Sequence, residues 1–414
     1  MNILLATYWP IPHLGGVWPF MLQVKRRLEQ LGHTVDLFGN GPDSPKYYIV
    51  NQERELSKEF ILPMLQRKLN ENANPLLNMD PWVRNVELDR YCLELSAAYF
   101  GLDHYDIIHA QDVISALAMS RVKSKHTALV ANVHGSLASE VILLLQRNQD
   151  PGYRESPVWK YYWALEHYGS AAADVTITST TWMKNILMQN FSVPEQQIST
   201  FPYGLDTDQF WSICAQGTDL TAPDGKKVII CPARLVYIKG LHFLISALQL
   251  LNQRRSDWVC WIVGEGDKKE DLMKQAIQAG VAGNVVFLGH RSDIPALLQQ
   301  ADIFVHPSIQ DNQPFSVMEA QVSGLPVVVS NAGGLPEMVQ HEVTGLVSPV
   351  GDVNMLASHL EFLLAHDEVR ANMGAAAKAW GTEYWSMDLM IGNLLKVYQR
   401  ALWPNKNSDY THLN

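Results

Sequence analysis

The sequence has few cysteines, no long apolar run and few positive charges, and each shortage excludes a class of protein. Its four cysteines form no Cys-x-x-Cys pair and no Cys/His spacing typical of zinc, which argues against a disulfide framework and a metal centre. Cys231 and Cys260 lie inside apolar runs, so we expect both to be buried. No stretch approaches the roughly 20 apolar residues that a membrane span needs.

Charge is also scarce, with 18% charged residues and a net charge of −10 at pH 7. A nucleic-acid surface needs clustered lysine and arginine, so we expect no nucleic-acid partner. Three consecutive cations, Lys25-Arg26-Arg27, are more typical of a solvated helix face than of a membrane-binding surface. The N-terminus lacks the basic start of a signal peptide. We therefore expect a cytoplasmic protein, and leave open a peripheral contact with the inner face of a membrane.

What the sequence does contain is a regular alternation of short apolar strands with amphipathic helices. The chain of 414 residues is 47% apolar, which fits two globular domains of roughly 200 residues each. One series begins with a strand at 3–6 and a helix at 17–31, and a second series restarts with a strand at 228–231. Strands separated by helices indicate parallel βαβ units. The prediction is two doubly wound, Rossmann-like α/β domains that face each other across a cleft.

Turn residues between 201 and 210 indicate where the first domain ends. The region from 40 to 104 is expected to be irregular, apart from two helical patches. The final helix is expected to pack back on the first domain, with a polar tail after it. The predicted divisions are an acceptor-side domain at 1–205, a nucleotide-sugar-binding domain at 206–384, and the returning helix with its tail at 385–414.

The stretch from Asp302 to Glu337 is the most informative part of the chain. A buried strand at 302–305 is followed by Asp311 and Glu319, then by a second apolar strand and a glycine pair, Gly333-Gly334. In an open α/β sheet, ligands bind at the carboxyl ends of strands, beside helix N-termini. The carboxylates would bind hydroxyl groups, and the helix start would bind an anion. A sugar attached to a phosphate needs both.

Two cations follow the first strand of the second series. Arg234 and Lys239 lie between that strand and a helix that opens at Gly240, so both are expected at the carboxyl edge of the same sheet. Arginine binds a diphosphate through two parallel hydrogen bonds, and lysine adds a point charge. The alternative is that both are ordinary solvated cations of a surface loop.

The first domain offers weaker candidates. Gly15-Gly16 joins the first strand to the first helix, where a backbone without Cβ atoms can approach a phosphate, although a tight turn explains the pair equally. His134 ends a strand and is either a group facing a sugar or a satisfied polar residue. His109 and Asp112 share that sheet edge and are weaker still.

The order of these motifs resembles the retaining glycosyltransferases of the GT-B fold, in particular family four of that class. The resemblance covers nearly the whole chain, is strongest over 228–350 and is loose between 40 and 105. The motifs that carry it are Gly15-Gly16, His134-Gly135, Pro202 to Asp206, Arg234 with Lys239-Gly240, Gly264-Glu265-Gly266, Phe287 to Gly289, His306-Pro307-Ser308, Asp311 with Glu319, and Gly333-Gly334 with Glu337.

The resemblance implies a nucleotide-diphosphate-sugar donor held mainly by the second domain. Arg234 and Lys239 would hold the diphosphate, Asp311 would face the transferred sugar, and Glu319 would bind the ribose. The remaining implied donor contacts are the backbone of Pro314, Phe315 and Ser316, the turn at Gly264, the backbone near Gly289 and His290 for the base, Gly15 and Gly16 for the phosphate, and His134 for the sugar.

Three positions depart from the family pattern. Asp311 stands where a glutamate is usual, and Asn312-Gln313-Pro314-Phe315 replaces a Gly-Phe-Gly segment. Tyr203 stands where an asparagine is common. These changes concern which sugar fits the site rather than the class of reaction.

The function implied is a metal-independent hexosyltransferase without a cofactor, which transfers a hexose from a UDP- or GDP-sugar with retention of configuration. Its acceptor would be a glycan, a lipid-linked molecule or a small molecule in glycan or polysaccharide biosynthesis. Two alternatives remain open at this point. One is a sugar-nucleotide epimerase of the same fold, and the other is a nucleotide-sugar-binding protein without catalytic activity.

Overall fold

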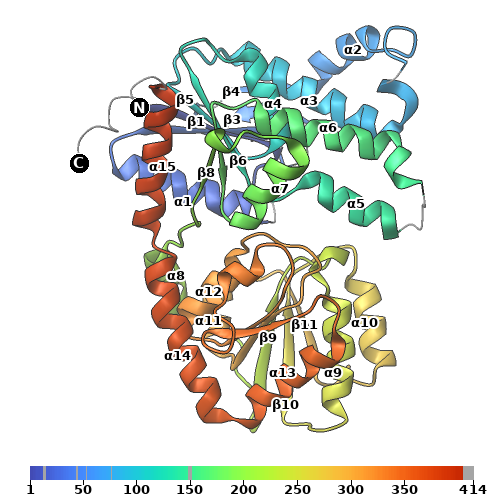
Figure 1. Ribbon diagram of the computed structural model, residues 1–414, viewed down its shortest axis with the longest axis vertical. Helices are drawn as coiled ribbons and strands as arrows, with labels where there is room; N and C mark the ends of the chain where they lie inside the picture. Colours follow the sequence, from blue (N-terminus) through green and yellow to red (C-terminus); the bar gives the residue numbers. More distant parts are fainter. Residues whose placement is uncertain (13–14, 43–44, 53, 76, 148–151, 404–414) are drawn as a thin grey trace. The chain divides into compact units, whose positions relative to one another are not determined.

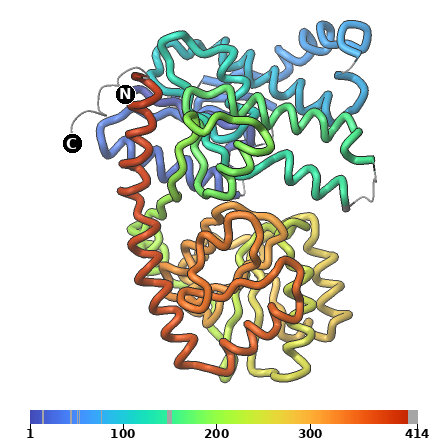
Figure 2. The backbone as a smooth tube through the Cα atoms, in the orientation of Figure 1, coloured from blue at the N-terminus to red at the C-terminus, as the bar shows by residue number. Residues whose placement is uncertain are grey.

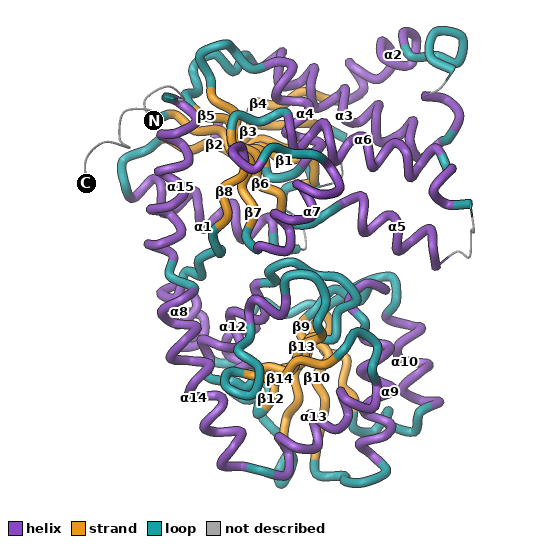
Figure 3. Tube along the Cα trace, viewed as in Figure 1, coloured by secondary structure: helices purple, strands orange, loops and turns teal. Residues whose placement is uncertain are grey.

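The protein is represented by a computed structural model that describes residues 1–12, 15–42, 45–52, 54–75, 77–147 and 152–403 (Figure 1). It divides into two compact units. Unit 1 contains Met1–Phe201 and the chain from Leu389 onward, and unit 2 contains Pro202–Asp388. Each unit has a central sheet with helices on both faces, which confirms the doubly wound α/β architecture (Figure 3).

The sheet of unit 1 has eight strands in the order β4-β3-β2-β1-β5-β6-β7-β8. Pairing is parallel from β2 to β8, and β3 and β4 add an antiparallel hairpin at one edge. The strands are β1 (Asn2–Pro10), β2 (Thr34–Asn40), β3 (Lys46–Ile49), β4 (Arg54–Ser57), β5 (Ile107–Ala110), β6 (Ala128–Val133), β7 (Val175–Thr178) and β8 (Ile198–Thr200). The hairpin lies in the region that the sequence indicated as irregular.

Helices α1 to α7 belong to this unit, and α2, α3, α4, α6 and α7 begin at side-chain caps. Asp80 accepts hydrogen bonds from the first amides of α3, and Pro157 follows the capping Ser156 at the start of α6. The helices are α1 (Val17–Gln30), α2 (Lys58–Lys68), α3 (Pro81–Phe100), α4 (Val113–Val122), α5 (Leu137–Arg147), α6 (Pro157–Ala171) and α7 (Thr181–Phe191). No helix in the described ranges is long and apolar enough to span a membrane.

Unit 2 has a wholly parallel six-stranded sheet in the order β11-β10-β9-β12-β13-β14. Its central strands are buried on both faces, which explains their continuous apolar sequences. The strands are β9 (Lys227–Pro232), β10 (Trp258–Val263), β11 (Val285–Gly289), β12 (Ile303–His306), β13 (Val327–Ser330) and β14 (Gly345–Ser348). Cys231 and Cys260 lie in β9 and β10 and are fully buried, as predicted.

The helices of unit 2 include α12, which follows β12 and begins beside the predicted site. The helices are α8 (Thr207–Gln216), α9 (Leu241–Asn252), α10 (Lys269–Gln278), α11 (Ile294–Leu298), α12 (Phe315–Ser323), α13 (Val353–Ala365) and α14 (Asp367–Tyr384). Helix α8 replaces part of the turn that the sequence indicated between 201 and 210, because Asp206 accepts a hydrogen bond from the Gln209 amide and caps a new helix there.

The last helix, α15 (Met387–Leu402), packs on unit 1, which confirms the expected return of the chain. Figure 2 shows this red segment joining the unit that contains the N-terminus. Tyr398 on α15 is fully buried, and its hydroxyl lies 2.8 Å from Nδ1 of His109. His109 therefore anchors the helix and is a structural residue.

Candidate active site

Three loops of unit 2 meet at the carboxyl edge of its sheet. Strand β12 pairs in parallel with β9 on one side and with β13 on the other, so the loops that follow these strands leave the same edge. The Ile309 amide donates to the Ile238 carbonyl over 2.7 Å, and the Gly334 amide donates to the Asp311 carbonyl over 3.0 Å. These bonds tie the loop after β12 to both of its neighbours.

Two glycines permit this close approach. A Cβ atom at Gly240 would lie 2.1 Å from the Pro307 carbonyl oxygen, and one at Gly333 would lie 1.9 Å from the Asp311 carbonyl oxygen. Both glycines have positive φ angles, +67° and +58°, which disfavour other residues as well. The loops could not meet in this way with side chains at either position.

The Asp311 carboxylate is the centre of a polar cluster. Its Oδ2 lies 2.5 Å from Nζ of Lys239, 2.7 Å from Nε2 of His306 and 3.3 Å from Oγ of Ser308. Lys239 and Asp311, both expected at the donor, are thus an ion pair with side chains only 13% exposed. The structure brings the expected diphosphate cation and the expected sugar-binding acid into direct contact.

This cluster keeps Asp311 ionised and His306 neutral. Burial would raise the pKa of the Asp311 carboxyl, but the charge of Lys239 and the His306 hydrogen bond outweigh it and hold that pKa below its usual range. Burial lowers the pKa of His306 more than its bond to Asp311 raises it. A neutral imidazole that donates from Nε2 leaves Nδ1 as an acceptor, and this buried atom has no partner among the described residues.

Arg234 lies on the loop after β9 and is exposed. Its guanidinium makes no hydrogen bond or ion pair with any part of the chain that the structure describes. The turn at Gly264 packs on this loop, since a Cβ there would lie 2.1 Å from the Ala233 carbonyl oxygen, and Leu235 donates to the Glu265 carbonyl over 2.9 Å. The backbone of this loop is therefore fixed by hydrogen bonds and packing, and the exposed Arg234 guanidinium can contact a ligand.

The N-terminus of α12 is a second positive group at this edge. Pro314 occupies the N-cap position without a side-chain hydrogen bond to the helix. The first amides of a helix have no intrahelical partner, and the helix dipole adds partial positive charge there. The start of α12 at Phe315 and Ser316 therefore suits a phosphate group.

Glu319 lies one turn further along α12 and is half-buried. Its carboxylate has neither a hydrogen bond nor an ion pair within the described ranges, and burial raises its pKa to about 7. A desolvated carboxylate without a partner is costly, and two neighbouring hydroxyl groups would satisfy it. A ribose has such a pair.

Two of the three departures from the family pattern, Tyr203 and the segment 312–315, contact each other. The Tyr203 amide donates to Oε1 of Gln313 over 2.7 Å, and the Tyr203 ring stacks on Phe315 with 6.0 Å between centroids. Tyr203 is 4% exposed. Tyr203, Gln313 and Phe315 thus pack together beside the start of α12.

His290, expected near the base, lies beside Gly289 at the end of β11 and is exposed. It lines a pocket of about 520 Å³ together with Arg291, Asp219 and Asp293. The Gly264 amide donates to the Gly289 carbonyl over 2.8 Å, which joins this segment to the turn beside Arg234.

The candidates of unit 1 have a different setting. Gly15 has a φ of +150°, and Gly16 caps α1 without a side-chain hydrogen bond. Nε2 of His134 lies 3.1 Å from Oε1 of Gln111, and its ring meets Phe20 edge to face. These residues belong to unit 1.

Asp112, a weaker candidate, is a structural residue. Its carboxylate accepts hydrogen bonds from the Thr7 hydroxyl over 2.9 Å and from the Ser115 amide over 2.7 Å, which caps α4.

Sequence reasoning missed His306 as a site residue. Its position as the last residue of a buried strand, five residues before Asp311, was the available signal.

Two family models match successive parts of the chain. The model described as Glycosyltransferase Family 4 matches residues 14–209, and the model described as Glycosyl transferases group 1 matches residues 216–380. The second match contains all the unit 2 site residues described above, apart from Tyr203.

Individual proteins are similar over the whole chain or over about half of it. An uncharacterized glycosyltransferase of Methanocaldococcus jannaschii is 25% identical over 97% of this chain and 99% of its own. A GDP-mannose-dependent alpha-(1-6)-phosphatidylinositol monomannoside mannosyltransferase of Mycobacterium tuberculosis is 33% identical, over 49% of this chain and 55% of its own. The structure of Anabaena HepE with UDP and glucose matches with a TM-score of 0.69 and 19% identity, over 96% of this chain and 99% of that one.

Proposed function

The chain belongs to the group 1, family 4 glycosyltransferases of the GT-B fold, and we propose that it moves a hexose from a UDP- or GDP-sugar to an acceptor hydroxyl. Transfer from a nucleotide-sugar donor is common to the family. The proposal adds the hexose, the nucleoside and retention of configuration. The acceptor is proposed to be a glycan, a lipid-linked molecule or a small molecule.

The observation that carries the proposal is the charge arrangement at the sheet edge of unit 2. Arg234, Lys239 and the start of α12 all follow strands that end at this edge. We assign the donor diphosphate to Arg234 and to the Phe315 and Ser316 amides, because the guanidinium and these two amides have no hydrogen-bond partner in the described structure. The charge of Lys239 is balanced by Asp311, and this ion pair holds the Asp311 carboxylate at the same edge.

The acids at the same edge are assigned to hydroxyl groups. Oδ2 of Asp311 is occupied by Lys239 and His306, whereas Oδ1 accepts the Asn312 amide, at 3.1 Å. Oδ1 therefore has capacity to accept a further hydrogen bond from a sugar hydroxyl. Glu319 accepts from the two ribose hydroxyls. His134 and Gly16 of unit 1 keep the roles that the resemblance implies for them, as predictions.

The proposed chemistry breaks the bond between the anomeric carbon and the diphosphate oxygen and forms a bond from that carbon to the acceptor oxygen. The leaving phosphate takes the acceptor's proton, and attack from the same face retains the configuration. Negative charge grows on the diphosphate as it leaves, so fixed positive groups lower the barrier. Asp311, ionised and paired, does not donate a proton in this scheme.

A thermal-shift panel of nucleotide sugars tests the donor assignment. Binding to the folded protein raises its apparent stability, so the panel identifies the base and the sugar together. Anabaena HepE forms a complex with UDP and glucose, and the mycobacterial relative is GDP-mannose-dependent, which supports testing both series first. A panel without any shift for UDP- or GDP-sugars would contradict the assignment.

Product analysis separates transfer from the alternatives. Incubation with donor and acceptor should give a glycoside whose anomeric configuration, read from the NMR coupling of its anomeric proton, equals that of the donor. An inverted product would contradict the proposed retention. Isomerised nucleotide sugar formed from donor alone would indicate an epimerase, and absence of any turnover with a bound donor would indicate a binding protein.

A further inference from the structure

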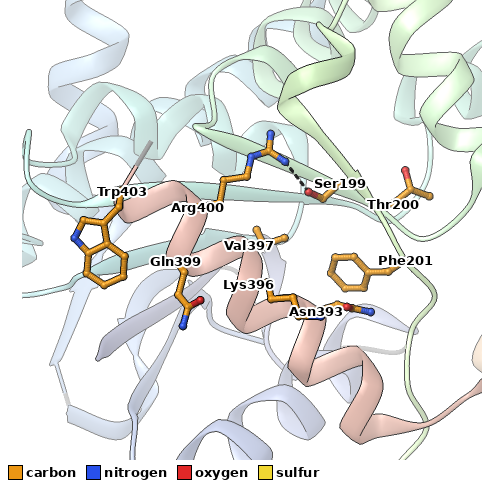
Figure 4. Close-up of a pocket in the computed structure, with 9 residues that line it drawn as sticks. All are labelled: Ser199, Thr200, Phe201, Asn393, Lys396, Val397, Gln399, Arg400 and Trp403. Atoms are coloured by element: carbon orange, nitrogen blue, oxygen red, sulfur yellow. Dashed lines mark hydrogen bonds between the residues drawn. The ribbon is translucent and has the colours of Figure 1, made fainter. Parts of the chain in front are cut away.

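A second pocket lies in unit 1 and contains none of the residues assigned to the donor. It has a volume of about 650 Å³ and is formed by the end of strand β8 and the last turns of helix α15 (Figure 4). Its walls include Phe201 after β8, and Asn393, Lys396, Arg400 and Trp403 on or after α15. This volume lies within the range of small-molecule sites.

Among the described residues that line this pocket, the charged ones are two cations, Lys396 and Arg400. Lys396 is exposed, and its ammonium has no hydrogen bond or ion pair within the described chain. Arg400 donates to Oγ of Ser199 over 3.0 Å and to the Gln196 carbonyl, which are both uncharged. No aspartate or glutamate among the described residues belongs to the lining. Two cations without an acidic partner are notable in a chain with a net charge of −10.

Aromatic groups stand at the two ends of the same pocket. Trp403 is 52% exposed, and Phe201 is half-buried, with Lys396 and Arg400 on the helix between them (Figure 4). Exposed aromatic faces suit the apolar faces of sugar rings, and the amide of Asn393 can bond hydroxyl groups. The cations suit a phosphate or a carboxylate.

We propose that this pocket binds a hexose unit that carries an anionic group, a phosphate or a carboxylate. Lys396 and Arg400 contact the anion, Trp403 stacks on the ring, and Asn393 binds a hydroxyl. Such a unit is supplied either by a free sugar phosphate or by a charged glycan. The site lies beyond the proposed transfer reaction, since it uses none of the residues assigned to the donor.

Calorimetric titration of the full-length protein tests this proposal. The probes are glucose 6-phosphate, glucuronic acid, glucose, inorganic phosphate and an oligosaccharide of galacturonic acid. Glucose 6-phosphate or the charged oligosaccharide should bind at least about tenfold more tightly than glucose or phosphate, because ring stacking and ion pairing act together. Tighter binding of glucose 6-phosphate would indicate that the natural ligand is a free sugar phosphate. Tighter binding of the oligosaccharide would indicate a charged glycan.

Charge reversal at Lys396 locates the site. Lys396→Glu should raise Kd for the anionic sugar at least about tenfold, and Trp403→Ala should weaken binding while Trp403→Phe restores part of it. Lys125→Glu, the same charge change at an exposed lysine elsewhere in unit 1, should leave Kd unchanged.

Three results would overturn the proposal. They are no binding of any anionic sugar, binding of phosphate as tight as that of both glucose 6-phosphate and the charged oligosaccharide, and an equal effect of Lys396→Glu and Lys125→Glu. A parallel titration with UDP separates these outcomes from a failure of the proposed function. UDP binding should be the same in all of these variants, since Lys396, Trp403 and Lys125 are not among the residues assigned to the donor.

Discussion

The ammonium of Lys239 lies 2.5 Å from the carboxylate of Asp311, so a cation assigned to the diphosphate side and an acid assigned to the sugar side form one ion pair. The pair is neutral as a whole. Free positive charge at this sheet edge therefore comes from Arg234 and the start of α12. A change in either member of the pair alters the charge that the other presents to a donor.

Neutralising Asp311 should separate binding from turnover. Asp311→Asn keeps the shape of the side chain and releases the charge of Lys239, so UDP should bind several-fold more tightly. Turnover should fall by about 100-fold, because the sugar loses its charged acceptor. Titration with UDP and steady-state kinetics measure the two effects. Asp224→Asn, an exposed acid without an ion pair in the described chain, is the matched control. Equal losses of binding and turnover would contradict the assignment.

Removing the guanidinium of Arg234 should reduce the rate more than it reduces stability. The residue is exposed and has no partner in the described structure, so Arg234→Ala should change the unfolding midpoint little. Its kcat should fall by about 100-fold or more, with partial recovery in Arg234→Lys. Kinetics and thermal unfolding are measured beside Lys274→Ala, an exposed cation elsewhere in unit 2. Unchanged turnover in Arg234→Ala would remove it from the site.

Donor affinity should depend on pH through Glu319. Its pKa in the free protein is raised by burial to about 7, so the carboxylate is largely protonated at pH 6 and ionised at pH 8. Only the ionised form accepts hydrogen bonds from both ribose hydroxyls, so Kd for UDP should fall several-fold, and at most about tenfold per pH unit, between these values. Glu319→Gln should abolish this dependence. If Kd for UDP still depends on pH in the Glu319→Gln variant, another group causes the dependence.

The buried acid of unit 1 should make stability fall with rising pH. Glu166 accepts the Ala138 amide through Oε2 at 3.0 Å, and burial raises its pKa from 4.5 to about 8. The folded state therefore keeps a proton that the unfolded state releases, and stability is lost as the pH rises from about 4.5 through 8. Urea unfolding of Glu166→Gln should show a gain over the wild type that is larger at pH 8 than at pH 5.5. An equal difference at both pH values would contradict the raised pKa.

Gly333 should be required for the loop that carries Asp311. Gly333→Ala places a Cβ 1.9 Å from the Asp311 carbonyl oxygen, in addition to its φ of +58°. Gly225 has a similar φ of +68° but no atom within 4 Å of its Cβ position, so Gly225→Ala isolates the backbone strain of roughly 1 kcal/mol. The first variant should lose more stability and bind UDP at least about tenfold more weakly. Equal behaviour of the two variants would show that the contact is unimportant.

The fold was predictable where strands are buried on both faces. Strands such as β9, β10 and β12 are continuous apolar runs, because both sheet faces of unit 2 are covered by helices. Strands β3, β4 and β8 escaped prediction because they contain only three or four residues and lie in the outer part of their sheet, with few buried positions. Their pairing depends on neighbours far along the chain.

The positions of the site residues were predictable, but their contacts were not. The carboxyl ends of β9 and β12 place Lys239 and Asp311 at one edge, and that follows from strand order. The ion pair between them, and the bond from His306, depend on how three loops close over Gly240 and Gly333. Sequence spacing carries no information on that closure.

The most direct test is a crystal structure with the nucleotide sugar that gives the largest thermal shift. We expect the diphosphate within hydrogen-bond distance of the Arg234 guanidinium and the first amides of α12, and the ribose hydroxyls on the Glu319 carboxylate. A donor bound elsewhere, or bound with Arg234 and Glu319 directed away from it, would contradict the proposed site.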